Sequence, residues 1–151
     1  MTLRLTTGLR NAMLDNASFK SIMGSGVLEI YSGSQPSSAA NAASGSKLVT
    51  ITQSGLTFSS ASPSTCLNFA SVAASGQINK SSGETWKGTA SQAGTASWFR
   101  FYSNNHTTGA SASAQRFDGA CGVGTGELQM SSTSIASGAT ITIDTFQVAL
   151  P

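Results

Sequence analysis

Apolar and polar residues alternate along most of this chain, in short runs separated by turns rich in serine and glycine. The run with the most aromatic residues is Thr95–Ser103. Its bulky side chains fall on two faces, with Phe99 and Phe101 on one and Trp98, Arg100 and Tyr102 on the other. Because both faces carry large side chains, this run is predicted to be a central strand. We expect a second sheet over one face, and loops, a helix or a partner chain over the other, with the phenylalanine pair in the core.

The N-terminal region has the one good helical pattern in the chain. Leu3 and Leu5 alternate with polar residues as an extended arm. Thr7 then stands where it can cap a short helix whose apolar stripe contains Leu9 and Met13. Glycines close the region, so we expect the arm and the helix within about the first 24 residues.

Further strands are expected wherever apolar or β-branched residues alternate between turns. These segments are Val27–Tyr31, Leu48–Thr52, Leu56–Phe58, Cys66–Phe69, Glu127–Met130 and Ala139–Leu150. In the last segment the apolar side chains change parity after Ile143. This predicts a β-bulge near Asp144 and Thr145, or a strand that switches sheets there. The pair Asp118-Gly119 predicts a tight turn.

These elements predict an all-β fold, an antiparallel β-sandwich or jelly roll with one short N-terminal helix. A chain of 151 residues without an internal repeat fits a single domain over residues 1–151. Charged residues make up 9% of the chain, against about a quarter in an average domain. The net charge is +2, and the basic residues are scattered. This distribution argues against nucleic acid as a partner.

Residues able to support catalysis are sparse, since the chain has one histidine and six carboxylates. His106 lies in the polar segment 104–113 with no acidic residue beside it, and we expect it to be a solvated loop residue. The glycines of Gly122–Gly126 have the wrong spacing for a nucleotide-binding loop, and no lysine of the P-loop type follows them. The sequence therefore predicts no catalytic residues, no metal ligands and no cofactor, and a protein that is not an enzyme.

The number of cysteines and the lengths of the apolar runs indicate the cellular compartment in which the chain is made. Cys66 and Cys121 are too few for a disulfide scaffold or a zinc site. Buried free thiols are the simpler interpretation, although the sequence leaves their pairing open. No apolar run reaches the length of a signal peptide or of a membrane span. We expect a chain made in the cytosol, without an export signal or a membrane partner.

Trp86 stands alone in the polar stretch Gln77–Gly88. A tryptophan in such a stretch either packs back over the edge of a core or offers a flat surface to a sugar or a partner. In the second interpretation Trp86, Trp98 and Tyr102 form a candidate set of stacking residues.

Several segments are informative in combination. In chain order they are Leu9–Asp15, Gly26–Pro36, Thr95–Phe101, Asp118-Gly119, Glu127–Met130 and Thr133–Ile135. Together they resemble a group of small uncharacterised proteins from tailed bacteriophages and prophages, over most of the chain outside Lys47–Trp86. The resemblance implies a structural component of a virion and brings no catalytic motif with it.

Two hypotheses follow from this resemblance and from the lack of a chemical site. The first is a non-enzymatic virion protein, assembled in the host cytoplasm as a homo-oligomer in contact with other virion proteins of the capsid, portal, neck or tail. It would be a capsid decoration or cement protein, or an accessory of the neck or collar. Its candidate assembly residues are Leu3, Leu5, Leu9 and Met13, because an alternating arm can add a strand to a neighbouring sheet. The alternative is a glycan- or receptor-binding module of a tail or head fibre, with the stacking residues as its binding surface.

Overall fold

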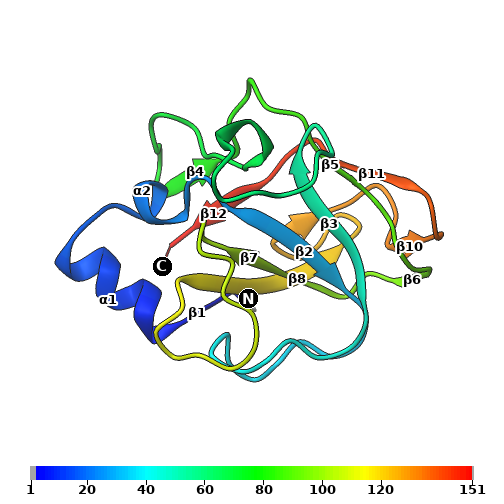
Figure 1. The fold of residues 1–151 in the computed structure, drawn as a ribbon, viewed down its shortest axis with the longest axis horizontal. Helices are drawn as coiled ribbons and strands as arrows, with labels where there is room; N and C mark the ends of the chain where they lie inside the picture. Colours follow the sequence, from blue (N-terminus) through cyan, green and yellow to red (C-terminus); the bar gives the residue numbers. More distant parts are fainter. Residues whose placement is uncertain (1–2, 151) are drawn as a thin grey trace.

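The alternation of apolar and polar residues along the chain produces an all-β fold with two short helices near the N-terminus (Figure 1). The structure is a computed structural model and describes residues 3–150. Met1 and Thr2, which belong to the predicted arm, and Pro151 lie outside the described residues. The predicted all-β class with an N-terminal helix is confirmed.

The elements follow in chain order. The strands are β1 Arg4–Leu5, β2 Val27–Tyr31, β3 Lys47–Gln53, β4 Gln77–Asn79, β5 Trp86–Thr89, β6 Gly94–Thr95, β7 Trp98–Tyr102, β8 Arg116–Gly122, β9 Leu128–Gln129, β10 Ser134–Ile135, β11 Thr140–Ile143 and β12 Gln147–Ala149. The helical segments are α1 Thr7–Asp15, α2 Phe19–Met23 and a 3-10 turn at Pro63–Thr65.

The strands form one large sheet and two small ribbons. The large sheet has the order β1-β8-β7-β2-β3-β5-β11, and its neighbours pair antiparallel. β9 lies off this path and pairs with β8 in parallel. The ribbons are β6 with β10 and β4 with β12. Figure 1 shows β12 and β4 crossing one side of the large sheet, next to α2.

The core lies on the face of the large sheet that carries Leu28 and Ile30 of β2 and the two phenylalanines of β7. Phe101 stacks on Phe117 of β8 with ring centroids 5.4 Å apart. Phe146, between β11 and β12, packs across these rings. The predicted position of the phenylalanine pair in the core is confirmed.

The N-terminal helix is capped one residue earlier than predicted. The hydroxyl of Thr6, rather than that of Thr7, accepts a hydrogen bond from the Leu9 amide at 3.2 Å. A second helix, α2, was not predicted because its five residues are too few to show a helical period. The hydroxyl of Ser18 caps it.

Two local predictions fail because packing overrides a turn or strand signal. Asp118-Gly119 is not a turn but lies in the middle of β8. A side chain on Gly119 would put its Cβ 2.6 Å from the Phe99 ring, so glycine here makes room for a core aromatic. Leu56–Phe58 contains no strand, and Cys66–Phe69 forms only isolated bridges.

The C-terminal prediction holds in its second form. β11 pairs with β5 of the large sheet, and β12 pairs with β4 of the ribbon. The change of apolar parity after Ile143 is therefore a change of sheet, and Phe146 enters the core where the chain crosses over.

Candidate functional site

The face of the large sheet opposite the core carries a row of charged side chains. The register places Glu29 opposite Arg100, Arg100 opposite Asp118, and Asp118 opposite Arg4. Charges of alternating sign therefore cross four neighbouring strands side by side. The row exists because these residues share the parity that points away from the phenylalanines.

The centre of the row is a fully buried ion pair between Arg100 and Asp118. Arg100 Nε lies 2.6 Å from Asp118 Oδ1, and Nη2 lies 2.7 Å from Oδ2, so the pair is bidentate. Both side chains are 0% exposed. Burial opposes the charge on Arg100, but the hydrogen bonds and the charge of Asp118 outweigh it and raise the pKa of the guanidinium. Arg100 also donates to the carbonyl oxygen of Asn41 at 2.9 Å, which ties a loop to the sheet.

Arg116 holds two loops over this face. Its guanidinium donates to the carbonyl oxygens of Ala39 at 2.8 Å and of Thr107 and Gly109 at 2.7 Å. The first acceptor belongs to the segment between β2 and β3, and the other two to the segment between β7 and β8. Burial, together with the charge of Arg100, lowers the pKa of Arg116. The predicted cover over this face is thus made of loops.

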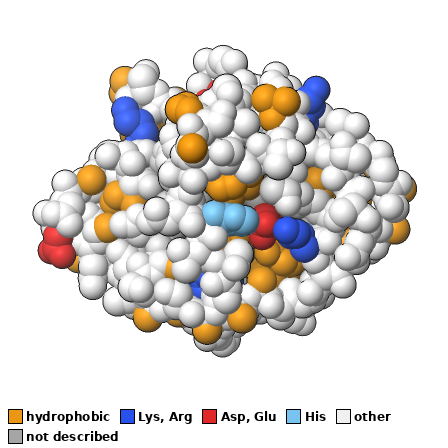
Figure 2. Space-filling view, in the orientation of Figure 1, with side chains coloured by type: hydrophobic (Ala, Val, Ile, Leu, Met, Phe, Trp, Pro, Cys, Tyr) orange, Lys and Arg blue, Asp and Glu red, His pale blue; other side chains and the backbone are white. Residues whose placement is uncertain are grey.

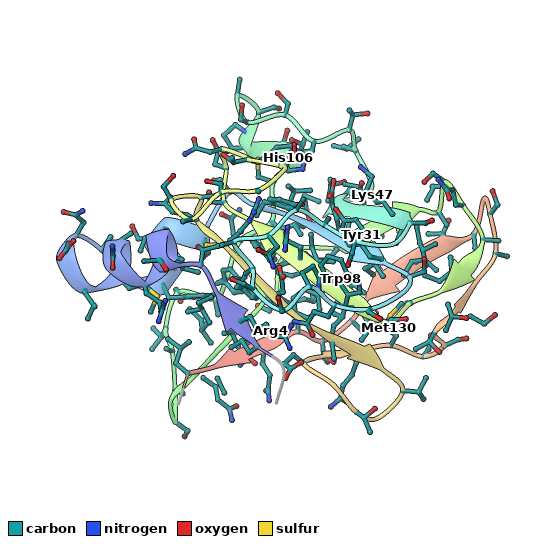
Figure 3. All side chains as sticks on the ribbon, turned by 90° about the horizontal axis from the view of Figure 1, so that it is seen from below. Arg4, Tyr31, Lys47, Trp98, His106 and Met130 are labelled. Atoms are coloured by element: carbon teal, nitrogen blue, oxygen red, sulfur yellow. The ribbon has the colours of Figure 1, made fainter. Side chains whose placement is uncertain are left out.

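At the open end of the row, Glu29 accepts three hydrogen bonds. Its Oε1 lies 3.0 Å from Lys47 Nζ and 3.2 Å from His106 Nε2, and its Oε2 lies 2.5 Å from the hydroxyl of Tyr31. The side chain of Glu29 is 2% exposed, against 47% for Lys47 and 30% for His106. In Figure 2 the histidine lies beside one acidic and one basic group, and Figure 3 shows Tyr31 beneath Lys47 and His106.

The hydrogen bonds decide the ionisation of Glu29. Burial alone would raise its pKa, but the bonds from His106, Tyr31 and Lys47 outweigh burial and lower the pKa to about 2. Glu29 is therefore a carboxylate at neutral pH and has no proton to give as a general acid.

His106 is not the solvated loop residue that the sequence predicts, because an acid 77 positions away orients it. Its backbone has φ +45°, in the left-handed region. Its ring packs edge-on against Tyr102, with centroids 4.8 Å apart, and against Phe58 at 5.3 Å. The loop conformation, the aromatic contacts and the Glu29 bond together fix the position of the imidazole.

These groups border a surface pocket of about 400 Å³, which we call the Glu29 pocket. Glu29, Lys47 and His106 form its polar side. Leu56 and Phe58 lie on its apolar rim, and the threonines of β3 contribute hydroxyls. Such a lining can hold a small ligand that has both hydroxyl groups and an apolar face.

Comparisons with known proteins do not identify a family for this chain. No family model, curated protein or solved structure matches the chain. Among residues 3–150, no group of three or more His, Cys, Asp or Glu side chains could hold a metal ion. No helix in that range is long and apolar enough to cross a bilayer.

The predicted stacking residues are inaccessible. Trp86, Trp98 and Tyr102 are all buried, so the prediction that they offer a stacking surface is wrong. Trp86 packs over the core beside Phe146, as its alternative interpretation allowed. Trp98 stacks on Tyr31 at 4.4 Å, beneath the loops.

The predicted assembly residues divide into two groups. Leu9 is buried in the core of its own chain and cannot contact a partner, which corrects that prediction. Leu3, Leu5 and Met13 are partly buried and pack against the same core. The arm adds its strand to β8 of its own sheet, since Leu5 pairs with Phe117. Both cysteines are free thiols, and Cys66 is buried.

Sequence reasoning did not identify Glu29 or Arg100 as members of a site. The available signal was a single charged residue in the middle of each of two apolar strands, at the parity opposite to the core residues. A charge in such a position is expected to have a partner. The identity of that partner depends on strand register, which one strand's sequence does not contain.

Proposed function

We propose that this chain is a non-enzymatic structural component of a tailed-phage virion, either a capsid decoration or cement protein or an accessory of the neck or collar. The observation that supports the proposal best is that the charged side chains of the sheet serve to hold the fold together. Arg100, Arg116 and Asp118 are buried, and they bind one another and the loop carbonyls instead of facing a substrate. The resemblance to phage and prophage proteins supports a place in the virion.

The surface is also suited to assembly. Ser, Thr, Gly and Ala make up most of the loops that the arginines hold in place, and these loops contain no Lys, Arg, Asp or Glu. Interface cores are depleted in charge, and such a face costs little to desolvate. Leu14, Val72 and Val123 are large apolar residues at the surface. They offer contacts to other virion proteins or to further copies in a homo-oligomer.

The test uses particles of the phage or prophage that encodes the chain, purified on a density gradient. We expect the protein to sediment with the particles, and deletion of its gene to yield particles that are unstable or incomplete. Complementation with the wild-type gene should restore normal particles. A protein that stays at the top of the gradient, with normal particles after deletion, would contradict the proposal.

A second candidate function is recognition of a glycan or receptor, and the Glu29 pocket favours it. A carboxylate, an imidazole and threonine hydroxyls beside Phe58 can bind hydroxyls and stack on an apolar sugar face. Host surface polysaccharide is the probe. Binding that Glu29→Gln weakens by about tenfold, while Lys20→Gln at a distant exposed site leaves it unchanged, would favour this function.

A further inference from the structure

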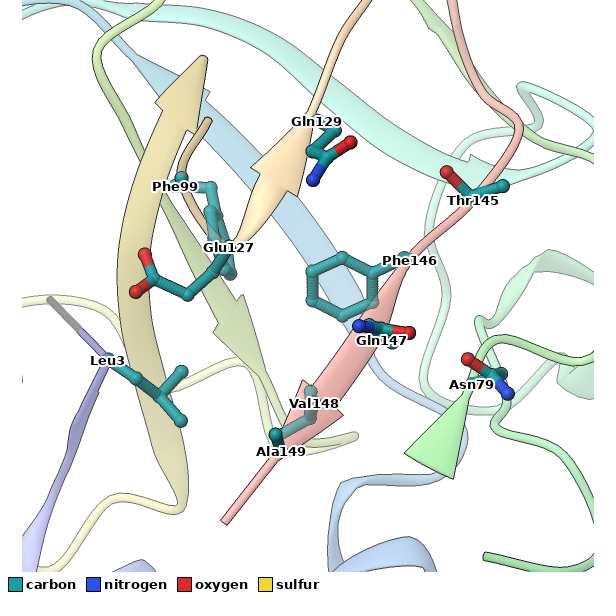
Figure 4. A pocket seen from close by; sticks show the side chains of 11 residues that line it. Leu3, Asn79, Phe99, Glu127, Gln129, Thr145, Phe146, Gln147, Val148 and Ala149 are labelled. Carbon is teal, nitrogen blue, oxygen red and sulfur yellow. The ribbon is translucent and has the colours of Figure 1, made fainter. Parts of the chain in front are cut away.

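The hollow between β9 and β12 offers little apolar surface (Figure 4). Its aromatic residues, Phe99 and Phe146, are 0% and 4% exposed. Polar side chains stand around it, among them Glu127, Gln129 and Gln147. This hollow is therefore poorly suited to apolar contact with another chain.

A different hollow, of about 400 Å³, lies between α2, β4 and the C-terminal end of β12, and we call it the α2–β12 hollow. Phe19, Ile78 and Val148 are its buried lining residues. Val72 and Leu150 also line it, and they are 76% and 36% exposed. The α2–β12 hollow is thus apolar both at its base and where it meets the solvent.

The one charged residue that lines this hollow within residues 3–150 is Lys20. Its Nζ donates to the carbonyl oxygen of Ser71 at 2.8 Å. No carboxylate in the described part of the chain forms an ion pair with it. Since an ammonium has three N–H donors, Lys20 can still bind a carboxylate that comes from outside.

The helix α1, which packs beside α2, carries the complementary pair of side chains. Leu14 is 85% exposed, and Asp15 follows it at the end of the helix and is also exposed. Asp15 forms no ion pair within residues 3–150. Figure 1 shows α1, α2 and the C-terminal end of β12 on the same side of the molecule. This side therefore has an exposed leucine next to an acid, and an apolar hollow next to a base.

The same side concentrates the exposed apolar residues. Of the five large apolar residues that are exposed in the described chain, three lie here, namely Leu14, Val72 and Leu150. Isolated apolar residues on a surface are ordinary, whereas several gathered on one side mark an interaction site.

We propose that two copies of the chain pair through this side, with Leu14 of each copy in the α2–β12 hollow of the other and Asp15 bound to the other copy's Lys20. The chain itself supplies both halves of the contact, which favours a second copy over a different protein. Because both halves lie on one side, a two-fold axis between them forms both contacts at once. Opposite charges then meet, and apolar surface covers apolar surface. The pairing forms in solution and does not depend on the proposed virion function.

Sedimentation velocity over a series of protein concentrations measures the pairing. We expect the wild-type chain to dimerise, and Leu14→Ala to raise the dissociation constant of the dimer about a hundredfold. Truncating one buried leucine costs about tenfold, and the two-fold axis counts the loss twice. The matched control is Leu56→Ala, at a leucine that is 49% exposed outside this side, and it should leave the constant unchanged.

Three results of this series would overturn the proposal. The first is a wild-type chain that stays monomeric up to about 1 mM. The second is a dimer that Leu14→Ala weakens no more than Leu56→Ala does. The third is growth beyond the dimer that Leu14→Ala abolishes, because it would exclude the two-fold arrangement.

A mixture of two variants tests whether Leu14 and the hollow meet. Val72→Asp places a charge in the wall of the hollow and should weaken its own homodimer as well. Mixed with Leu14→Ala, it can form one intact contact, between its Leu14 and the unaltered hollow of the other variant. We expect the mixed dimer to be about tenfold tighter than either homodimer. A mixed dimer no tighter than the homodimers would overturn the proposal. Both residues are exposed, and circular dichroism verifies that the variants fold.

Charge reversal tests the ion pair between the copies. Asp15→Lys and Lys20→Asp each bring like charges together twice in the dimer, so each should weaken it about tenfold. The double variant restores opposite charges and should bind within about twofold of the wild type. A double variant as weak as the single ones would overturn the pairing of Asp15 with Lys20.

Discussion

Replacing Asp118 by Asn isolates the contribution of the buried ion pair. The substitution keeps the shape of the side chain and removes its charge. Arg100 then remains 0% exposed, with two N–H groups aimed at an amide instead of a carboxylate. A buried charge that loses its counter-ion has no water to replace the lost interaction.

Removing one partner of a buried ion pair costs about 3–5 kcal/mol. The amide oxygen of Asn still accepts one hydrogen bond, so we expect a value near the lower limit, about 3 kcal/mol. For a chain of this length, 1 kcal/mol shifts Tm by about 2–4 °C. Asp118→Asn should therefore lower Tm by about 6–12 °C.

Urea denaturation followed by circular dichroism measures the free energy of unfolding of both proteins. The control is the double variant Arg100→Met with Asp118→Leu, which removes both charges of this ion pair. It should be more stable than Asp118→Asn alone, although it loses the Arg100 bond to Asn41. If the free energy of unfolding of Asp118→Asn lies within about 1 kcal/mol of the wild-type value, the ion pair does not stabilise the fold as argued above.

Three further predictions concern single side chains. The lowering of the Glu29 pKa from 4.5 to about 2 corresponds to about 3 kcal/mol in the free energy of unfolding. This stability is present above pH 4.5 and lost as the pH falls toward 2, so urea titrations should show a weaker acid dependence for Glu29→Gln. Gly88→Ala would put a Cβ 2.0 Å from the Thr50 carbonyl oxygen and should cost about 2 kcal/mol or more in the same assay. Gly83→Ala meets no atom within 4 Å and should stay within about 0.5 kcal/mol. Burial, reinforced by the charge of Glu127, raises the pKa of the Cys121 thiol. Iodoacetamide should therefore label this thiol at pH 8 only after the protein unfolds. Rapid labelling of Cys121 in the native protein would contradict this prediction.

The strands that alternation predicts best are those at the centre of the sheet. Val27–Tyr31 is β2 with the predicted bounds, and the aromatic run contains β7. Both strands have large side chains on each face, so local pattern and tertiary packing agree. The change of apolar parity after Ile143 predicted either a β-bulge or a change of sheet, and the pairing of β11 and β12 with different strands shows the second.

Other features depended on contacts between distant parts of the chain. The Asp118-Gly119 pair has the composition of a turn, but Phe99 needs the space that Gly119 leaves. Trp86 has polar neighbours in sequence, yet it lies in β5 and packs over the core. Glu29 and His106 meet only because the loop after β7 folds back over β2. Sequence pattern gives the faces of each strand, whereas these contacts need the register between strands.

The central claim is that the chain is a structural part of a virion, and its copy number per particle tests that claim most directly. Quantitative mass spectrometry of purified particles, with the major capsid protein as the internal standard, gives this number. A constant ratio to the capsid protein would support a decoration or cement protein, and a small fixed number would support a neck or collar accessory. Absence of the chain, or a ratio that varies between preparations and falls with further purification, would contradict the account.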